Sequence, residues 1–552
     1  MICYAFLLST RRGPGSQKSS DGRNAVLLAT GAKWDDPADR KGKIFLRKNS
    51  DIMEEAESDE GLYDFLDEND FESSGEDACD DSETENFVED EVDASLRKLH
   101  VAVVVQGDLG RSPRMQFHAA SLCSDDRVKT VSVVGLEGES CYEQLEKFAR
   151  NGSNDGLQPK LKKCLMSPQT FGKIYLRRAG ERSRFLFAAL SPIRAFIQAL
   201  QLFWILAVVV EGPLDVILVQ NPPSIPTLAI CVLVSRLRGA RFVVDWHNLG
   251  FSVLAMRFGG NAQHWMCRAA RLYEKIFSSF ADAGFCVTMA MREWLQREFG
   301  VRSDSLHVLY DKPPASFRRL DAKERRELLG RLDLDIGKGE RLVISSTSWT
   351  PDEDFSILLD AVVAYEKASS KKDSNLPKLH FVITGKGPQK AMYLERIAKL
   401  NLKRTTIRAL WLEASDYPKL LGAADLGVCL HTSTSGIDLP MKVVDMFGSG
   451  LPVCAVNFRC LGELVVDGEN GRTFDDADQL ALQFIALFGG GDDELRKLRN
   501  GATKKGSERW REQWLKVAAP VILVPQSRRK RWGTMSLFVV VFLLLWRWFC
   551  SA

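Results

Sequence analysis

Short apolar runs alternate with longer amphipathic segments along the chain from residue 100 onward. The run "HVAVVVQGDLG" at residues 100–110 is almost continuously apolar and ends in glycines, and residues 111–122 follow with a helical pattern. Similar alternation covers residues 129–136, 215–237, 240–250 and 283–299. Fully apolar strands that alternate with helices are typical of a parallel sheet with helices on both faces. Ligands of such sheets bind where the strands end, so we expect function in the loops that follow the apolar runs.

A second series of the same kind begins after a break at residues 310–339, where "DKPPASF" precedes a charged helix. Its apolar runs start at residues 341, 379, 407, 426 and 451. We therefore predict an α/β protein with two Rossmann-like doubly wound domains in tandem and a cleft between them. The predicted borders are 97–320 for the first domain and 321–525 for the second.

Charge is distributed unevenly over the 552 residues. The net charge is +2, but residues 51–93 hold 21 Asp and Glu and no Lys or Arg, so the rest of the chain is basic. A basic remainder favours an anionic partner, although scattered solvated lysines explain it equally well. The acidic segment lacks apolar periodicity, and we predict that residues 1–96 are a disordered acidic extension.

Two further apolar segments bear on membrane association. Residues 528–531 are a basic cluster, and twelve uncharged, mostly apolar residues follow from Met535 to Trp546. We predict a basic flank and a membrane anchor at residues 528–552, with an interfacial or packed helix as the alternative. The run from Ala195 to Val210 predicts a helix that is either buried or lies against the bilayer.

The twelve cysteines are widely spaced and contain no CxxC pair, which argues against a zinc site. Several of them, such as Cys231 and Cys429, lie inside apolar runs. We expect these to be buried free thiols in a reducing compartment.

Loops of the first domain carry residues suited to an anion and to proton transfer. In "GDLGRSPRMQ", Gly110 permits close approach of the backbone, while Arg111 and Arg114 suit a phosphate, although a plain strand-to-helix turn would look similar. His247 follows a predicted strand and is flanked by Asp245 and Asn248, which favours a site role, as a donor to an oxyanion or as a base, over a structural one.

Loops of the second domain resemble those of a nucleotide-binding half-domain. "SSTSWTPDEDF" contains Ser348 and Trp349, and "TGKGP" places Lys386 between two glycines. Neither loop is a GxGxxG motif or a P-loop, so each is a weak signal alone.

The stretch "HTSTSGIDLPMKVVDMFGSG", which begins at His431, is richer in polar groups. Lys442 and Asp445 are three residues apart on a predicted helix, so they share a face. A carboxylate can accept hydrogen bonds from both hydroxyls of a ribose, and a lysine can neutralise a diphosphate. The stretch therefore favours a nucleoside-diphosphate sugar, with a surface helix carrying an ion pair between these two residues as the alternative.

Several motifs together resemble one family. "GDLGRSPRMQFHAASL", "VQNPPSIPTL", "DWHNLGFSVLAMRFG", "STSWTPDEDFSILLDA" and "ELVVDGENGRTF" are similar to segments of the eukaryotic chitobiosyldiphosphodolichol beta-mannosyltransferases, in order, between about Leu99 and Val521. "PMKVVDM" resembles a glycosyltransferase segment, PxKxxE, in which the acidic residue meets the ribose; here that residue is Asp445. The sequence departs from the family in lacking an obvious N-terminal membrane segment and in having Gly462 where histidine is expected.

The resemblance implies a GT-B fold and an inverting transfer of mannose from GDP-mannose, in β-1,4 linkage, to dolichyl-diphosphate-linked GlcNAc2. It implies no cofactor and no metal that the fold requires, with stimulation by a divalent ion left open. It places the protein at the endoplasmic reticulum membrane with its catalytic domains in the cytosol, with other early glycosyltransferases of lipid-linked oligosaccharide synthesis as candidate partners.

An inverting displacement needs a base on the acceptor side and neutralised charge on the leaving-group side. We expect His247 to be the base, with Asp108 as the second candidate. The predicted donor residues are Ser348, Trp349, Lys386, His431, Ser435, Gly436, Asp438, Lys442 and Asp445. The predicted acceptor or diphosphate residues are Gly110, Arg111, Arg114, Asn221 and Asn248.

Two other function classes compete with this one. The first is a GT-B epimerase or a transferase with another donor, which the membrane-leaning apolar segments disfavour. The second is a non-catalytic scaffold, which the intact Lys442, Asp445 and "GDLGRSPR" loop disfavour. Nucleic-acid binding would explain the basic remainder, but no recognition motif supports it.

Overall fold

The apolar runs of the first half form a sheet of seven parallel strands. In the computed structural model, which describes residues 98–150, 160–166, 184–350, 352–413, 415–433 and 435–524, the strand order is β3-β2-β1-β4-β5-β6-β7. The central strands are buried because helices cover both faces. The strands are β1 (Leu99–Asp108), β2 (Val128–Leu136), β3 (Leu161–Met166), β4 (Val216–Asn221), β5 (Arg241–Trp246), β6 (Ala283–Cys286) and β7 (Leu306–Val308).

The second half forms a separate sheet of six parallel strands in the order β10-β9-β8-β11-β12-β13. Its strands are β8 (Arg341–Ser346), β9 (Leu379–Thr384), β10 (Thr405–Leu410), β11 (Leu426–Cys429), β12 (Val453–Val456) and β13 (Gly471–Phe474). In both sheets the first strand of the half lies inside the order, so the chain winds outward in both directions from it. This confirms the predicted pair of doubly wound, Rossmann-like sheets.

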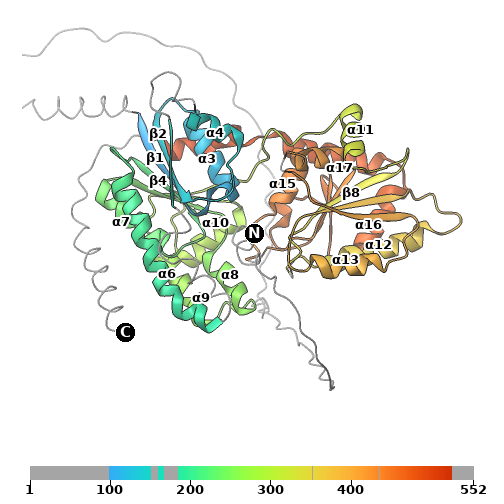
Figure 1. The fold of residues 1–552 in the computed structure, drawn as a ribbon, viewed down its shortest axis with the longest axis horizontal. Helices are drawn as coiled ribbons and strands as arrows, with labels where there is room; N and C mark the ends of the chain where they lie inside the picture. Colours follow the sequence, from blue (N-terminus) through green and yellow to red (C-terminus); the bar gives the residue numbers. More distant parts are fainter. Residues whose placement is uncertain are drawn as a thin grey trace, which may run out of the picture. The chain divides into compact units, whose positions relative to one another are not determined.

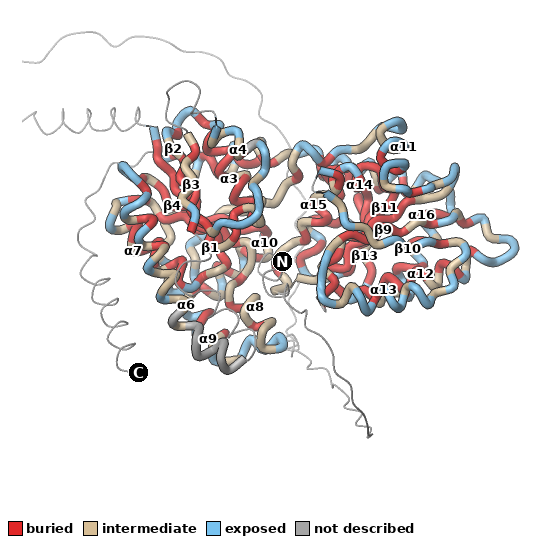
Figure 2. Tube along the Cα trace, viewed as in Figure 1, coloured by how far each residue is buried: buried red, intermediate tan, exposed pale blue. Residues whose placement is uncertain are grey.

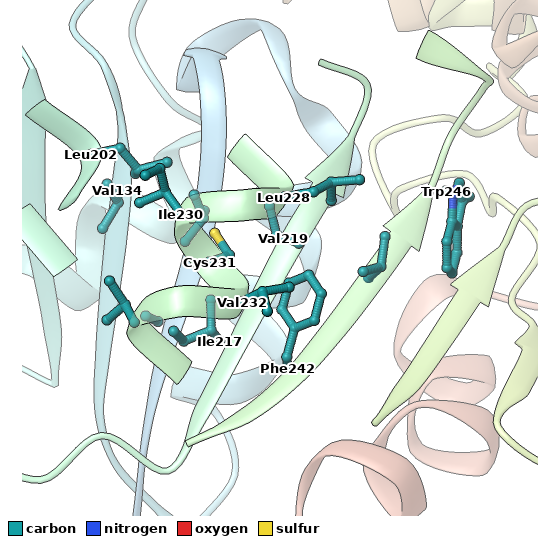
Figure 3. Close-up of a cluster of buried hydrophobic side chains, with 14 of the residues drawn as sticks. Val134, Leu202, Ile217, Val219, Leu228, Ile230, Cys231, Val232, Phe242 and Trp246 are labelled. Atoms are coloured by element: carbon teal, nitrogen blue, oxygen red, sulfur yellow. The ribbon is translucent and has the colours of Figure 1, made fainter. Parts of the chain in front are cut away.

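Two core clusters lie on opposite faces of the first sheet, since alternate residues of β1 belong to different clusters. Figure 1 shows α6, α7 and α9 together on one side of this sheet. Figure 3 shows how Leu202 of α6 packs with α7 side chains such as Ile230 and Cys231. The helices of this half are α3 (Pro113–Cys123), α4 (Glu143–Arg150), α6 (Arg184–Trp204), α7 (Thr227–Arg238), α8 (Gly250–Ala255), α9 (Trp265–Ser278) and α10 (Met289–Trp294).

The second sheet is likewise enclosed by two clusters of buried side chains. Figure 2 shows the strands of both sheets mostly buried and the surrounding helices exposed along their outer edges. The helices here are α11 (Ala322–Arg331), α12 (Phe355–Ser369), α13 (Lys390–Ala398), α14 (Tyr417–Ala423), α15 (Met441–Gly448), α16 (Ala477–Gly489) and α17 (Asp493–Ser507).

The last described helices, α18 (Trp510–Val517) and α19 (Ala519–Ile522), pack on the first half rather than the second. Trp510 and Trp514 are buried in the same cluster as β1 and α3. The indole of Trp510 donates a hydrogen bond to Ser121 Oγ on α3 at 3.1 Å. The predicted border at residues 320 and 321 therefore does not follow the packing of these two helices.

The predicted acidic extension and the predicted C-terminal membrane segment lie outside the described residues. Among the residues that the structure does describe, no helix has the length and apolar character needed to cross a membrane. Cys231 and Cys429 are free and buried, as predicted.

Candidate active site

The turn after β1 is held by Asp108. Its carboxylate accepts hydrogen bonds from the backbone N–H of Gly110 at 2.9 Å and of Glu139 at 3.1 Å. A side chain at position 110 is excluded, because a Cβ there would lie 2.2 Å from the Glu139 carbonyl oxygen. Arg111 also pairs with Glu139, through its Nε at 3.1 Å. The turn is thus tied to the loop after β2, and an anion at Arg111 would compete with Glu139.

Asp245 is a buried carboxylate at the end of β5, and Arg114 binds it through two nitrogens. The Nε and Nη2 atoms of Arg114 donate to the two carboxylate oxygens at 2.8 and 2.9 Å. The Nη1 atom donates to Asp311 and to the Leu309 carbonyl, both at 2.8 Å. Burial alone would raise the pKa of Asp245, but the charges of Arg114 and His247 hold it well below its ordinary value. The predicted contact of Arg114 with an acceptor diphosphate stays a prediction, and its guanidinium already holds the carboxylate of Asp245 in place.

Two histidines contact the same oxygen of Asp245. The Nε2 atom of His247 lies 2.9 Å from Oδ2 of Asp245, and Nε2 of His118 lies 3.3 Å from it. His247 remains partly exposed, whereas His118 is fully buried, and burial lowers the pKa of His118. When Nε2 of His247 donates to Asp245, its Nδ1 lone pair is left for a proton. A carboxylate that orients an imidazole and stabilises its protonated form is the arrangement that a general base requires.

A buried glutamate that sequence reasoning missed joins two predicted acceptor loops. Glu274 of α9 accepts hydrogen bonds from the Asn221 side chain and from the backbone N–H of Gly250 at 3.0 Å. It thereby links the end of β4 to the start of α8, the helix that follows Asn248. Glu274 lies 27 residues beyond His247 inside an amphipathic helix, where its sequence pattern resembles that of any partly buried glutamate.

Glu353 organises the donor loops of the second half, and sequence reasoning missed this residue too. Its carboxylate pairs with the Lys442 ammonium and accepts hydrogen bonds from Thr347 Oγ1 at 2.8 Å and from the Ser348 N–H at 2.6 Å. Nδ1 of His431 lies 3.4 Å away. Burial opposes ionisation of Glu353, but His431 and Lys442 outweigh it and lower its pKa. Lys442 therefore pairs with Glu353, and the predicted alternative of an ion pair with Asp445 is wrong.

The glycine loop "TGKGP" packs tightly against the loop that contains Ser348. A Cβ at Gly385 would lie 1.8 Å from the Thr347 carbonyl oxygen, and one at Gly387 would lie 1.7 Å from that of Ser348. Trp349 is fully buried and its Nε1 donates to the Gly385 carbonyl at 3.3 Å. The Lys386 ammonium lies 3.4 Å from the centre of the Trp411 ring. The side chain of Trp349 thus belongs to the core, which leaves its backbone for the predicted donor contact.

Asp438 shapes the loop before α15. Its Oδ1 accepts hydrogen bonds from Ser435 Oγ at 2.9 Å and from the hydroxyl of Ser433. Gly436 between them has φ of +73°, which favours glycine. The predicted roles of Ser435, Gly436 and Asp438 in donor binding stay predictions, and these residues fold the loop onto itself.

Asp445 differs from the carboxylates of Asp108, Asp245, Glu353 and Asp438. Within the described parts of the chain, its side chain makes no hydrogen bond or ion pair. Burial and the nearby charge of Asp311 raise its pKa well above the ordinary value. Its own charge adds to burial in raising the pKa of Tyr142 and Tyr417. A ribose would offer hydroxyl donors to this carboxylate without displacing an existing partner.

Contacts of Glu463 and Thr288 connect the two halves near these loops. Glu463 accepts hydrogen bonds from the N–H groups of Met289 and Ala290, both at 2.8 Å, and so caps α10. The hydroxyl of Thr288 donates to the Ile437 carbonyl at 2.6 Å. Beside Glu463, a Cβ built on Gly462 meets no atom within 4 Å. The position where family members are expected to carry histidine thus borders open space.

In the portion of the chain that is described, no group of three or more His, Cys, Asp or Glu side chains is arranged to hold a metal ion.

Comparison with known proteins identifies related sequences for both halves. The family model for glycosyl transferases group 1 matches residues 340–489, and the model for the glycosyl transferase 4-like domain matches residues 174–311. The UDP-glycosyltransferase TURAN of Arabidopsis thaliana is 42% identical over 477 residues, covering 77% of this chain and 97% of that protein. Chitobiosyldiphosphodolichol beta-mannosyltransferases are 37% identical in Dictyostelium discoideum, covering 77% of this chain and 94% of that one, and 38% identical in Homo sapiens, covering 77% and 92%.

Solved structures support the fold. The Anabaena protein Alr3699/HepE in complex with UDP has a TM-score of 0.50 at 15% identity, covering 76% of this chain and 98% of that one. WaaG, a glycosyltransferase of lipopolysaccharide biosynthesis, has a TM-score of 0.50 at 13% identity, covering 76% and 99%. At these identities the likeness shows the GT-B fold alone.

Proposed function

Because this chain belongs to the family of chitobiosyldiphosphodolichol beta-mannosyltransferases, we propose that it transfers mannose from GDP-mannose to dolichyl-diphosphate-linked GlcNAc2. The product carries a new β-1,4 linkage, and the reaction takes place on the cytosolic side of the endoplasmic reticulum membrane. The observation that carries the proposal is the pair formed by His247 and the buried Asp245 at the carboxyl edge of the first sheet.

In this reaction the acceptor hydroxyl attacks the anomeric carbon of mannose as the bond to GDP breaks. The hydroxyl proton passes to Nδ1 of His247, and Asp245 stabilises the resulting imidazolium. The bonding electrons leave with the diphosphate, and the anomeric configuration inverts. Lys442 and the start of α15 are the groups that would offset the negative charge that develops on GDP.

Asp108 is the weaker candidate for the base. Both of its carboxylate oxygens already accept backbone hydrogen bonds, and they hold the turn that precedes α3. Substitution of Asp108 would therefore disturb the turn, whereas the imidazole of His247 contacts the carboxylate of Asp245 and holds no backbone group among the described residues.

Asp445 supports the nucleotide part of the proposal. Its carboxylate stands on the first turns of α15 without a partner among the described residues, where it could accept hydrogen bonds from two ribose hydroxyls. A UDP-sugar is the second candidate donor, because one relative with 42% identity bears the name UDP-glycosyltransferase. A carboxylate that binds ribose does not distinguish guanine from uracil, so the donor must be settled by measurement.

The test is sugar transfer by the full chain in detergent, with a phytanyl-diphosphate GlcNAc2 acceptor and either GDP-[14C]mannose or labelled UDP-sugars. We expect a β-linked trisaccharide lipid from GDP-mannose only, and none from Asp445→Ala. Transfer from a UDP-sugar alone would replace the proposed donor. A well-folded protein that binds neither nucleotide would overturn the proposal.

His247→Ala tests the base in the same assay. We expect kcat to fall by about 10²- to 10⁴-fold with unchanged affinity for GDP. The matched control is His380→Ala, since His380 pairs with Glu340 on the second sheet, away from the site. Near-normal turnover of His247→Ala would transfer the assignment to Asp108.

A further inference from the structure

Two helices of the first half expose a row of large apolar side chains. On α6 and its last turn, Phe196, Leu200, Trp204 and Val208 recur every four residues and are 40%, 52%, 60% and 51% exposed. On α9, Trp265, Leu272 and Ile276 are 66%, 59% and 45% exposed. Spacings of four and seven residues place each set on one side of its helix. We call these seven residues the α6–α9 face.

Both helices belong to one layer on the sheet. Leu202 and Leu206 at the end of α6 and Ala270 of α9 are buried in the same core cluster. Each helix contacts α7, which lies between them and is buried along most of its length. The apolar residues of the α6–α9 face thus remain exposed after the core is filled.

The charges on and beside the two helices are mostly basic, although Arg271 also pairs with Glu298 at 2.7 Å. Residues 195–210 contain no charged side chain. The exposed charges of α9 are Arg268, Arg271 and Lys275, whereas its single acid, Glu274, is buried. Residues 173–184, which lead into α6, hold five basic residues and one acidic one. Aromatic and aliphatic side chains with basic neighbours are the composition of helices that lie in a bilayer interface and bind anionic lipids.

We propose that the α6–α9 face lies on the surface of an anionic phospholipid bilayer, with Trp204 and Trp265 at the level of the headgroups. The apolar side chains enter the outer part of the hydrocarbon layer, and the basic residues contact lipid phosphates. The purpose of this contact rests on the proposed function, since a dolichyl-linked acceptor is itself held in the membrane. A protein partner would need acidic or polar groups opposite the basic residues of this face, and nothing in the face favours such a partner over a bilayer.

The same helix connects the lipid surface to the site. While its outer side carries Leu272 and Ile276, its inner side carries Glu274, which holds Asn221 and the start of α8. A bilayer beneath α9 would therefore lie under the loops that are predicted to receive the acceptor. The lipid-linked diphosphate could reach these loops without its polyprenyl chain leaving the membrane.

Photo-crosslinking of the full chain tests the contact directly. We would replace Trp204 or Leu272 with p-benzoylphenylalanine and illuminate the protein on vesicles of phosphatidylcholine and phosphatidylserine that contain an alkyne-labelled phospholipid. The matched control is the same replacement at Leu482 on α16 of the second half, which is 65% exposed. We expect lipid adducts at positions 204 and 272 and none at 482. Crosslinks to residues 525–552 of the same chain or to a second copy would overturn the proposal. The absence of lipid adducts at positions 204 and 272 would overturn it too.

Kinetics provide the second measurement. In the double variant Leu200→Glu and Leu272→Glu, we expect kcat/KM for a long polyprenyl acceptor in vesicles to fall about tenfold or more, because two charges would enter the interface. Turnover of a phytanyl acceptor in detergent should stay within about twofold of wild type, which also shows that the variant folds. Equal losses in both assays would contradict a membrane role. Lipid adducts from a protein without transferase activity would keep the membrane contact and reject the proposed function.

Discussion

The indole Nε1 of Trp514 donates a hydrogen bond to Nδ1 of His118 over 3.0 Å, although the two residues are 396 positions apart. Indole is only a donor, so Nδ1 of His118 must carry its lone pair and the ring proton must lie on Nε2. That proton faces Asp245, which also contacts His247. Helix α18, near the end of the described chain, thus fixes the tautomer of His118. The ring of His118 and the proposed base His247 both contact Asp245.

Trp514→Phe removes this donor and keeps an aromatic ring in the core. We expect the free energy of unfolding to fall by about 1–3 kcal/mol, because Nδ1 of His118 is left buried without a partner. Without the Trp514 donor, the ring of His118 is free to carry its proton on Nδ1, and Nε2 would then no longer present an N–H to Asp245 at 3.3 Å. We therefore expect the pH profile of kcat to shift, which stopped assays between pH 5 and 9 would measure.

Trp510→Phe is the matched control for that experiment. It removes a hydrogen bond from the same helix to Ser121 and keeps an aromatic ring beside His118 and Arg114, which the indole of Trp510 contacts. We expect a similar loss of stability and an unshifted pH profile. Equal shifts in both variants would mean that helix packing, and not the tautomer of His118, controls the profile.

Glu353→Gln leaves the buried Lys442 without its anion. We expect the free energy of unfolding at pH 7 to fall by about 3–5 kcal/mol and the affinity for GDP to drop. The pKa of Glu353 is lowered in the folded protein from a reference of 4.5, so its contribution is complete above pH 4.5 and is lost as the pH falls further. Urea unfolding should therefore show wild type and variant converging in acid.

The control for this change is Glu366→Gln, since Glu366 is another buried glutamate of the second half that accepts backbone hydrogen bonds away from the donor loops. It should lose stability while calorimetry shows normal affinity for GDP. If Glu353→Gln also binds GDP normally, the role of Glu353 is confined to folding.

Asp445→Asn should separate stability from binding. Burial and Asp311 raise the pKa of Asp445 in the folded protein, so the folded state holds this proton more tightly than the unfolded chain. Wild type therefore loses stability as the pH rises above 3.8, and the variant does not. We expect Asp445→Asn to have the higher Tm at pH 7.5, a difference that shrinks toward pH 4, together with weaker binding of GDP.

Thermal unfolding and titration of GDP would be compared with Asp360→Asn, which changes an exposed carboxylate of α12. That control should alter neither quantity. A lower Tm for Asp445→Asn at pH 7.5 would mean that the carboxylate has a stabilising partner in solution.

Glu274→Gln tests the brace between the acceptor loops. The amide oxygen of glutamine can still accept from Asn221 and Gly250, but its NH2 group would face the backbone N–H of Phe251, which now donates to Oε2 at 3.4 Å, so the loops should loosen. We expect a loss of about 1–3 kcal/mol in kcat/KM for the acceptor, with unchanged affinity for GDP. Glu298→Gln, which removes a surface partner of Arg271, is the control and should change little.

The two parallel sheets could be predicted from the sequence, because buried strands and the helices that cover them produce local patterns of apolar residues. It also predicted His247 and Asp445 as site residues, because ligand sites follow strand ends, and these assignments stay predictions. The buried glutamates Glu274 and Glu353, which organise the loops, could not be predicted in this way. Glu353 meets Lys442 across 89 positions, and nothing in "PDEDF" distinguishes it from the acidic residues beside it.

Trp349 shows that the position of a residue in a site loop does not reveal where its side chain lies, and its predicted donor contact stays a prediction. The loop turns back at a positive φ of +50°, and this directs the indole into the core against Phe355. Arg114 was similarly assigned to an anion from its position in the loop. Its partner Asp245 is 131 positions away, and only the assembled sheet brings the two together.

The return of α18 and α19 to the first half bears on how the protein is made. Trp510, Trp514 and Ile522 complete the cluster that covers one face of the first sheet. A ribosome releases β1 and α3 long before it has synthesised these residues. The N-terminal half therefore keeps an exposed apolar surface until the second half has been synthesised. Its folding cannot be completed before that of the second half begins.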